Sequence, residues 1–151
     1  MKCILFSTER IEFRRGSPSN RPRSIVPESA AGETGVYSDL VVAFLCIEDN
    51  DTDVDAGALA DDICAYGTQL GRRVLLVPFV HLTSQPCLSP ERRAQLWRII
   101  EAHLKLQNLL HARLADGYDR ALIARWETKD HKCGVAFRDS RHRSNLRERI
   151  P

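Results

Sequence analysis

The chain has 151 residues, of which 43% are hydrophobic and 28% are charged. This size and balance predict one folded domain and exclude a wholly disordered chain. No apolar run approaches the ~18 residues that span a bilayer, and the apolar run at the N-terminus is too short for a signal peptide, so a membrane protein is excluded. The five cysteines are scattered, with no Cys-x-x-Cys pair, which favours a reducing cytoplasm.

The formal net charge is only +2, but its distribution is uneven. Seven acidic residues and no basic ones lie between Glu48 and Asp62, whereas nine lysines or arginines and four acidic residues lie between Arg120 and Arg149. This asymmetry predicts a solvated acidic edge in the first segment and a polyanion contact in the second. A frayed, charged tail accounts for the second segment equally well on charge alone.

The first third of the chain has the pattern of strands. An apolar run at 2–6 and an alternating stretch at 10–15 predict a hairpin or two early strands. Three prolines within 16–35 predict a long surface loop. The continuous β-prone run at 40–47 is typical of a strand buried on both faces.

A helix and a second buried strand follow the acidic segment. Apolar residues from Leu59 to Leu70 recur at helical spacing, and Gly71 can cap the end of that helix. The run at 74–80 then predicts a strand. Strand, helix and strand form a βαβ unit, which predicts two parallel strands joined by a right-handed crossover.

The second half predicts another helix and more strands. Ser89 and Pro90 are a good N-cap and first helical residue, and we expect this helix to stop near Asn108. His103 lies beside its apolar stripe and is expected to be a packing or surface histidine and not a ligand. The stretch 109–113 could extend the helix or begin a strand. Further strands are predicted at 118–126 and 132–137. The expected fold class is therefore α/β, with a mixed α+β sheet and two main helices.

The segment from Val77 to Ser84 is the strongest candidate for a site. It ends the second parallel strand, and ligands of such sheets bind at the carboxyl edge of the strands. Pro78 removes one ladder donor, which leaves neighbouring backbone groups available to a ligand. His81 is expected at the mouth, with Thr83 and Ser84 nearby; a surface histidine that caps the turn is an equally good interpretation of the residues alone.

Other patterns argue against several classes of enzyme. His131 and Cys133 lack zinc-site spacing, and a nucleophilic pair of Cys87 and His81 requires spatial proximity that the sequence does not show. No Gly-x-Ser-x-Gly turn and no glycine-rich phosphate loop occurs. We therefore expect no metal and no cofactor, and neither a dehydrogenase nor a nucleotide hydrolase.

Four stretches in the same order and with nearly the same spacing resemble the N-terminal editing domain of archaeal threonyl-tRNA synthetases. They are Lys-Cys-Ile-Leu-Phe-Ser-Thr-Glu-Arg-Ile-Glu-Phe from Lys2, Leu-Val-Val-Ala-Phe-Leu-Cys-Ile-Glu from Leu40, Val-Pro-Phe-Val-His-Leu-Thr-Ser from Val77 and Gly-Tyr-Asp-Arg-Ala from Gly117. The likeness runs from Met1 to about Arg141. It implies a D-aminoacyl-tRNA deacylase-like fold, built from a β-hairpin, a βαβ crossover and C-terminal strands.

The resemblance also implies an activity, namely hydrolysis of the ester that joins a wrongly attached serine to threonine-specific tRNA. In that family the 3′-terminal adenosine is held largely by main-chain groups, the 2′-hydroxyl of the RNA helps to activate water, and no cofactor takes part. An aminoacyl ester is already labile, so positioning a water and stabilising the oxyanion can suffice. A homodimer is implied as well.

Individual roles follow by position from the same resemblance. The substrate-binding residues would be Cys46, Ile47, Pro78, Phe79, Val80 and Tyr118. His81 would order the substrate and the water. Arg120 stands where the family has a lysine that contacts the reacting end; it keeps the charge but has a larger, forked head.

One departure from the family favours a second interpretation. Val135 stands where the family has a glutamate in its last strand, and Glu127, Asp130 or Asp139 are candidate replacements. A non-catalytic module that binds tRNA or a synthetase would keep the fold without this chemistry. A deacylase acting on a nonprotein analogue of threonine is a third possibility.

The C-terminal end predicts an RNA contact. We expect an editing domain at 1–141 and a basic tail at 142–151, in a freestanding protein or an excised piece of a synthetase. Arg138, Arg141, Arg143 and Arg147 would bind tRNA in place of missing domains, through roughly 3–5 phosphate contacts. A threonyl-tRNA synthetase acting in trans is a further possible partner.

Overall fold

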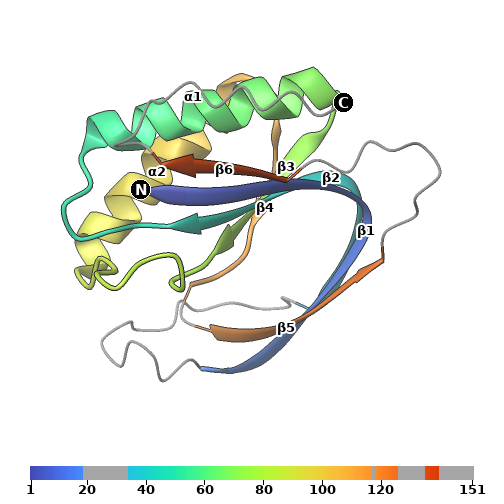
Figure 1. Cartoon of the computed structure of the whole chain (residues 1–151), viewed down its shortest axis with the longest axis horizontal. Coiled ribbons are helices and arrows are strands. Elements are labelled where there is room, and N and C mark those ends of the chain that lie inside the picture. Colours follow the sequence, from blue (N-terminus) through green and yellow to red (C-terminus); the bar gives the residue numbers. More distant parts are fainter. Residues whose placement is uncertain (19–33, 117, 126–134, 140–151) are drawn as a thin grey trace.

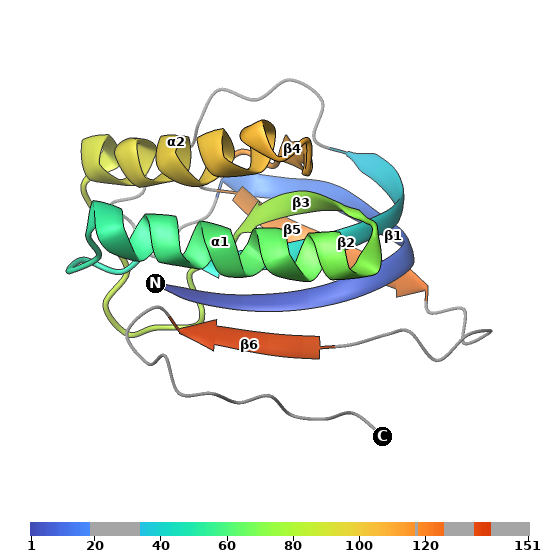
Figure 2. The same cartoon turned by 90° about the horizontal axis from the view of Figure 1, so that it is seen from above.

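The computed structural model describes residues 1–18, 34–116, 118–125 and 135–139, and all statements below concern these residues. In chain order the elements are β1 (Lys2–Pro18), β2 (Gly35–Cys46), α1 (Asp53–Leu70), β3 (Arg73–Pro78), α2 (Pro90–Leu106), β4 (Leu110–Arg113), β5 (Tyr118–Arg125) and β6 (Val135–Asp139). Both helices lie on one face of a mixed sheet (Figures 1 and 2). The predicted fold class is confirmed.

The six described strands form one sheet in the order β4-β3-β2-β1-β5, and β6 pairs with the first part of β1. Strands β2, β3 and β4 are parallel, whereas β1 is antiparallel to β2, β5 and β6. The predicted βαβ unit is therefore confirmed as β2, α1 and β3. Its last residue pair, Leu45 with Pro78, marks the carboxyl edge at which a ligand was expected.

The prediction of a hairpin or two separate strands at 2–6 and 10–15 was wrong. A single strand, β1, runs through both halves, because Ser7 and Thr8 stay paired with Val41 and Leu40 of β2. Ser7 and Thr8 are both fully buried, and Thr8 donates its hydroxyl to the Arg10 carbonyl (3.0 Å). The polar Ser-Thr-Glu stretch resembles a turn in sequence, but here it lies inside a long curled strand.

The curl of β1 allows it to pair with two different strands along one edge. Its first part pairs with β6 (Phe6 with Val135), and its second part pairs with β5 (Arg15 with Arg120). Figure 1 shows β1 and β2 bending together, so that β5 lies on the far side of the sheet from the helices. Phe6, Phe13, Val42, Leu75 and Val77 fill the concave side as a second hydrophobic cluster.

The main core lies between the sheet and the helices. It combines alternate residues of the central strands with the apolar stripes of α1 and α2, and its members include Leu5, Leu45, Leu76, Ile63 and Ile100. The alternation of β2 residues between the two clusters explains why its sequence reads as a continuous apolar run.

Both helices begin where the sequence can cap them. Ser89 caps α2, with Pro90 at its first position, as predicted. The α2 helix ends at Leu106, close to the expected stop near Asn108, which has a positive φ of 55°. The open alternative for 109–113 is resolved as a strand, because β4 pairs in parallel with β3.

A capping box fixes the start of α1. The Thr52 hydroxyl accepts from the Asp55 amide (3.2 Å), and the Asp55 carboxylate accepts from the Thr52 amide (2.9 Å). Gly71, in the left-handed region at φ 62°, ends the helix as predicted. The acidic segment therefore supplies the first turn of a helix, where carboxylates are favourable.

Replacing Thr52 with alanine is expected to lower the free energy of unfolding by about 1 kcal/mol, because the Asp55 amide loses its cap. Urea denaturation followed by circular dichroism measures this. Thr68→Ala is the matched control, since Thr68 is an exposed residue within the same helix and alanine has the higher helix propensity. Equal effects of the two substitutions would contradict the capping role.

The C-terminal strands agree with the prediction as far as they are described. The strand expected at 118–126 is observed as β5 at Tyr118–Arg125. The strand expected at 132–137 is observed as β6 at Val135–Asp139. The turn expected at 127–130, the loop interior at 19–33 and the basic tail lie outside the described residues.

Candidate functional site

The candidate site begins where β3 ends. Pro78 is the last residue of the strand and has no N–H to donate, and the next amide, that of Phe79, donates to the Leu45 carbonyl (2.9 Å). The chain then leaves the sheet over a loop that returns to the end of β2, where the Cys87 amide donates to the Ile47 carbonyl (2.9 Å). The end of β3 is thus held against the end of β2.

Residues after the strand end are divided between its two sides. The Phe79 ring meets Phe44 on the concave side of the sheet (centroids 5.3 Å apart), and the His81 ring packs edge-on against Phe79 (5.1 Å). Pro78, Phe79 and Val80 also line a cavity together with residues of α2. His81 is exposed, so the structure places an accessible imidazole at the mouth of the strand end.

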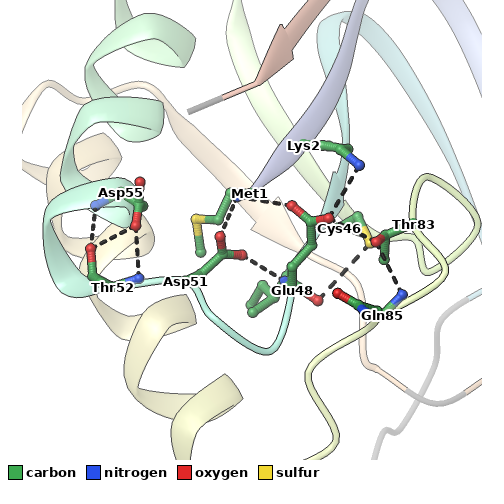
Figure 3. A network of polar contacts seen from close by, with 10 residues as sticks. Met1, Lys2, Cys46, Glu48, Asp51, Thr52, Asp55, Thr83 and Gln85 are labelled. Atoms are coloured by element: carbon green, nitrogen blue, oxygen red, sulfur yellow. Dashed lines mark hydrogen bonds and ion pairs between the residues drawn. The ribbon is translucent and has the colours of Figure 1, made fainter. Parts of the chain in front are cut away.

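A buried carboxylate anchors the loop that carries His81 (Figure 3). The Glu48 carboxylate accepts from the Thr83 hydroxyl (2.7 Å) and pairs with the Lys2 ammonium (3.1 Å). Thr83 in turn accepts from the Gln85 amide (3.1 Å). Three segments of the chain, the ends of β1 and β2 and the loop after β3, therefore meet at Glu48.

The α-amino group of Met1 completes this network. It forms an ion pair with Asp51 and lies 3.4 Å from the Glu48 carboxylate. Asp51 also accepts from the Glu48 amide (2.6 Å). Met1, Glu48 and Asp51 are all buried, so the charge cluster drawn in Figure 3 is largely excluded from water.

The prediction of a solvated acidic edge is wrong at Glu48 and Asp51. Their exposed fractions are 4% and 3%, because the Met1 and Lys2 cations lie against them. Their role was missed, although one signal was present: Glu48 directly follows a buried strand, a position at which an unpaired charge would be costly. The exposed Asp49 fits the original prediction.

The Cys46 thiol is protonated at neutral pH. Burial raises its pKa from 9.0 to about 11; the nearby Glu48 and Asp51 carboxylates add to this, whereas a backbone hydrogen bond at Leu82 and the Lys2 charge oppose it. A nucleophilic cysteine needs a lowered pKa. Cys87 is also buried, with a raised pKa, so the pairing of Cys87 and His81 gains no support.

Cys46 should make stability depend on alkaline pH. Because the pKa is higher in the folded protein than 9.0, the stabilising contribution is complete below pH 9 and is lost as the pH rises towards 11. Urea denaturation at pH 8 and pH 10.5 should show a larger loss of stability for the wild type than for Cys46→Ala. Equal losses for the two proteins would contradict the assignment.

The cavity beside the strand end holds several of the predicted substrate-binding residues. Its walls are Leu45, Ile47, Pro78, Phe79, Val80, Pro86, Cys87, Arg93, Trp97 and Asp116. Arg93 and Asp116 form an ion pair across it, and both are largely buried. Ile47, Pro78, Phe79 and Val80 are thus brought together, whereas Cys46 lies apart, beside Glu48 and Lys2. Arg93, Trp97 and Asp116 were not predicted.

The remaining predicted residues are only partly placed. Tyr118 and Arg120 lie in β5, with Arg120 in register with Arg15, and their side chains are outside the described part of the chain. Their approach to the strand end remains a prediction. Arg138 lies in β6 opposite Cys3 and is partly exposed. Arg141, Arg143 and Arg147 fall outside the described residues.

Of the three candidate replacements for the glutamate of the editing domains, only Asp139 lies in the described part of the chain, where its backbone is placed. Val135 pairs with Phe6. Asp139 pairs with Lys2, the residue whose ammonium contacts Glu48, while Glu127 and Asp130 lie outside the described residues. Glu48 is therefore a further candidate to replace the missing glutamate. Its carboxylate contacts Thr83 in the loop after β3.

Two features of other classes of protein are absent from the described residues. No group of three or more histidine, cysteine, aspartate or glutamate side chains in this part of the chain is arranged to hold a metal ion. His131 and Cys133 lie outside it. Neither described helix combines the length and the hydropathy needed to cross a bilayer.

Comparison with known proteins gives a likeness in structure and none in sequence. No protein-family model matches the chain, and no curated protein matches its sequence. Among solved structures the chain is similar to the c-Myc DNA unwinding element binding protein, with a TM-score of 0.62 over 92% of this chain and 98% of that chain. The chain has a D-aminoacyl-tRNA deacylase-like fold. At 13% identity, the likeness concerns the fold alone.

Within this D-aminoacyl-tRNA deacylase-like fold, the candidate site has three parts. They are the exposed His81 imidazole after the end of β3, the small cavity next to it and the buried Glu48 carboxylate, which holds the loop that carries His81. Fold likeness does not assign the chemistry of such a site.

Proposed function

We propose that this chain is a trans-acting aminoacyl-tRNA deacylase that hydrolyses the ester of mischarged threonine-specific tRNA, with serine as the attached amino acid. The observation that carries this proposal is the grouping of Ile47, Pro78, Phe79 and Val80 around one cavity, with His81 exposed beside it. These are residues that the resemblance to archaeal editing domains assigns to the substrate.

The chemistry requires few catalytic groups. A water adds to the acyl carbon, the bond from that carbon to the 3′-oxygen of the terminal adenosine breaks, and serine leaves while the oxygen regains a proton. His81 holds the water and substrate in place, and the RNA 2′-hydroxyl assists the proton transfer. The Phe79 amide is engaged by the Leu45 carbonyl, so the amides that follow it in the loop would stabilise the oxyanion, a contribution that can be large.

Glu48 acts as a positioning residue in this scheme. Its carboxylate holds Thr83, two residues after His81, and so restrains the loop on which the imidazole is carried. The cost of misplacing a catalytic group by 1 Å can reach about 100-fold in rate. Arg120 takes the place of the family lysine at the reacting end.

The proposed partners follow from charge and from the family. The tRNA is bound through its acceptor end, with Arg138, Arg141, Arg143 and Arg147 on its phosphates, and the chain acts in the cytoplasm as a homodimer or beside a threonyl-tRNA synthetase. Binding that depends on such contacts weakens steeply with salt.

The alternative is a non-catalytic module that binds tRNA or a synthetase. The valine at position 135, where the family has glutamate, favours it. This alternative predicts salt-sensitive binding of tRNA without hydrolysis. It also predicts that the behaviour of the protein towards tRNA is unchanged when His81 is replaced by alanine.

A panel of charged tRNAs separates these proposals. Threonine-specific tRNA carrying labelled serine, threonine or a nonprotein analogue of threonine is incubated with micromolar protein, and release of the amino acid is compared with spontaneous hydrolysis. Faster release of serine than of threonine supports the proposal, while selective release of the analogue would move the substrate to that acyl group. Release of none of them above the spontaneous rate rejects the deacylase and leaves the binding module.

A further inference from the structure

The strongest feature outside the predicted site residues is the Trp97 indole. Its side chain lines the cavity beside the end of β3, and the residue is only 3% exposed. Among the described residues, its Nε1–H has no hydrogen-bond partner, and it is the one buried side-chain nitrogen or oxygen found in that condition. A buried tryptophan N–H normally has a partner.

The ring is held in place by its neighbours. Trp97 follows Arg93 by one helical turn of α2, and Arg93 is fixed by its ion pair with Asp116. The Arg113 guanidinium lies over the Trp97 ring, 5.3 Å from its centroid, and it is fixed in turn by Glu101 (2.6 Å). The donor is therefore preorganised, a condition under which a hydrogen bond to a ligand discriminates well.

The size and the lining of the cavity limit which group of a ligand could reach the Trp97 indole from it. Its volume is about 10 Å³, which is the space that one water-sized group requires. It is partly open to the surface, and much of its wall is apolar, formed by Leu45, Ile47, Pro78 and Val80. A single oxygen fits such a space, whereas an additional methyl group would meet these walls.

We propose that Trp97 is a specificity-determining residue whose indole N–H donates a hydrogen bond to the side-chain hydroxyl of the acyl group. This inference rests on the proposed function and names the feature of the substrate that the cavity selects. Seryl esters would place their hydroxyl at Nε1. Alanyl esters would leave the donor unpaired, and threonyl esters would bring a methyl group against the apolar wall.

Rates of deacylation on one tRNA test this selection. Threonine-specific tRNA is charged with serine, alanine or threonine, and the wild type is compared with Trp97→Phe, which keeps a ring and removes the N–H. The wild type should prefer seryl over alanyl esters about tenfold, as expected for one hydrogen bond. Trp97→Phe should lower the seryl rate about tenfold more than the alanyl rate. Tyr66→Phe, a matched loss of a polar aromatic atom on α1, should leave the preference unchanged.

The outcomes separate this inference from the proposed function. If the wild type hydrolysed seryl and alanyl esters at equal rates, or if Trp97→Phe lowered both rates equally, the role of Trp97 would be overturned. The proposed deacylase activity would still hold. Hydrolysis of no ester would reject the deacylase and, with it, this role.

A binding measurement covers the case in which Trp97→Phe does not fold. In a Trp126→Phe background, Trp97 is the single tryptophan, and its fluorescence reports on the cavity during titration with an amide-linked, non-hydrolysable seryl-adenosine. A spectral shift that the alanyl analogue does not reproduce is expected. Equal responses to the two analogues would overturn the inference.

Discussion

Replacing Asp51 with alanine is expected to lower the free energy of unfolding by about 3–5 kcal/mol, the usual result of breaking a buried ion pair from one side. The Met1 amino group, fully buried, would lose its closest anion. The Glu48 amide would lose its acceptor as well (2.6 Å). Urea denaturation at neutral pH measures the change.

Asp49→Ala is the matched control for Asp51. Asp49 lies two residues away and is exposed, and surface substitutions usually change stability by less than about 0.5 kcal/mol. If both variants lost the same small amount of stability, the charge cluster would not be holding the ends of β1 and β2 together.

Replacing His81 with alanine is expected to lower the rate of seryl-tRNA deacylation by at least about 100-fold, the lower range for a group that positions water or transfers a proton. The exposed ring packs only against Phe79 among the described aromatic rings, so stability should change little. Single-turnover release of labelled serine measures the rate, and thermal denaturation verifies the fold.

His111→Ala provides the control for His81. His111 is also an exposed histidine packed against an aromatic ring, that of Tyr37 (centroids 5.7 Å apart), but it lies on β4 away from the end of β3. A loss of rate shared by both variants would attribute the effect to general disturbance. If the rate of seryl-tRNA deacylation were unchanged in His81→Ala, the imidazole would have no role in the mechanism.

The parts of the fold that depend on local pattern were predictable. The helical spacing up to Leu70, the cap at Gly71 and the Ser89-Pro90 start are signals read within one turn of chain. The long curled β1 was not, because Ser7 and Thr8 are held in the strand by partners more than thirty residues away. Pairing at that distance leaves no mark in the local sequence.

The site was predictable to a similar extent. The carboxyl edge of a parallel strand and the missing amide of Pro78 located His81. Ile47 and Val80 were assigned by the resemblance to editing domains, and the structure groups them around one cavity. The contributions of Glu48 and Trp97 could not be predicted. Each depends on a partner from elsewhere in the chain: Met1, Lys2 and Thr83 for the carboxylate, and the residues around the cavity for the indole.

The central claim is that the end of β3 holds the terminal aminoacyl-adenosine, and chemical-shift mapping tests it most directly. The ¹⁵N-labelled protein is titrated with a non-hydrolysable, amide-linked seryl-adenosine. The largest saturable shifts are predicted at the amides of Phe79, Val80 and His81, with smaller ones at Ile47. Shifts confined to other parts of the chain, or none at millimolar ligand, would contradict the assignment of the site.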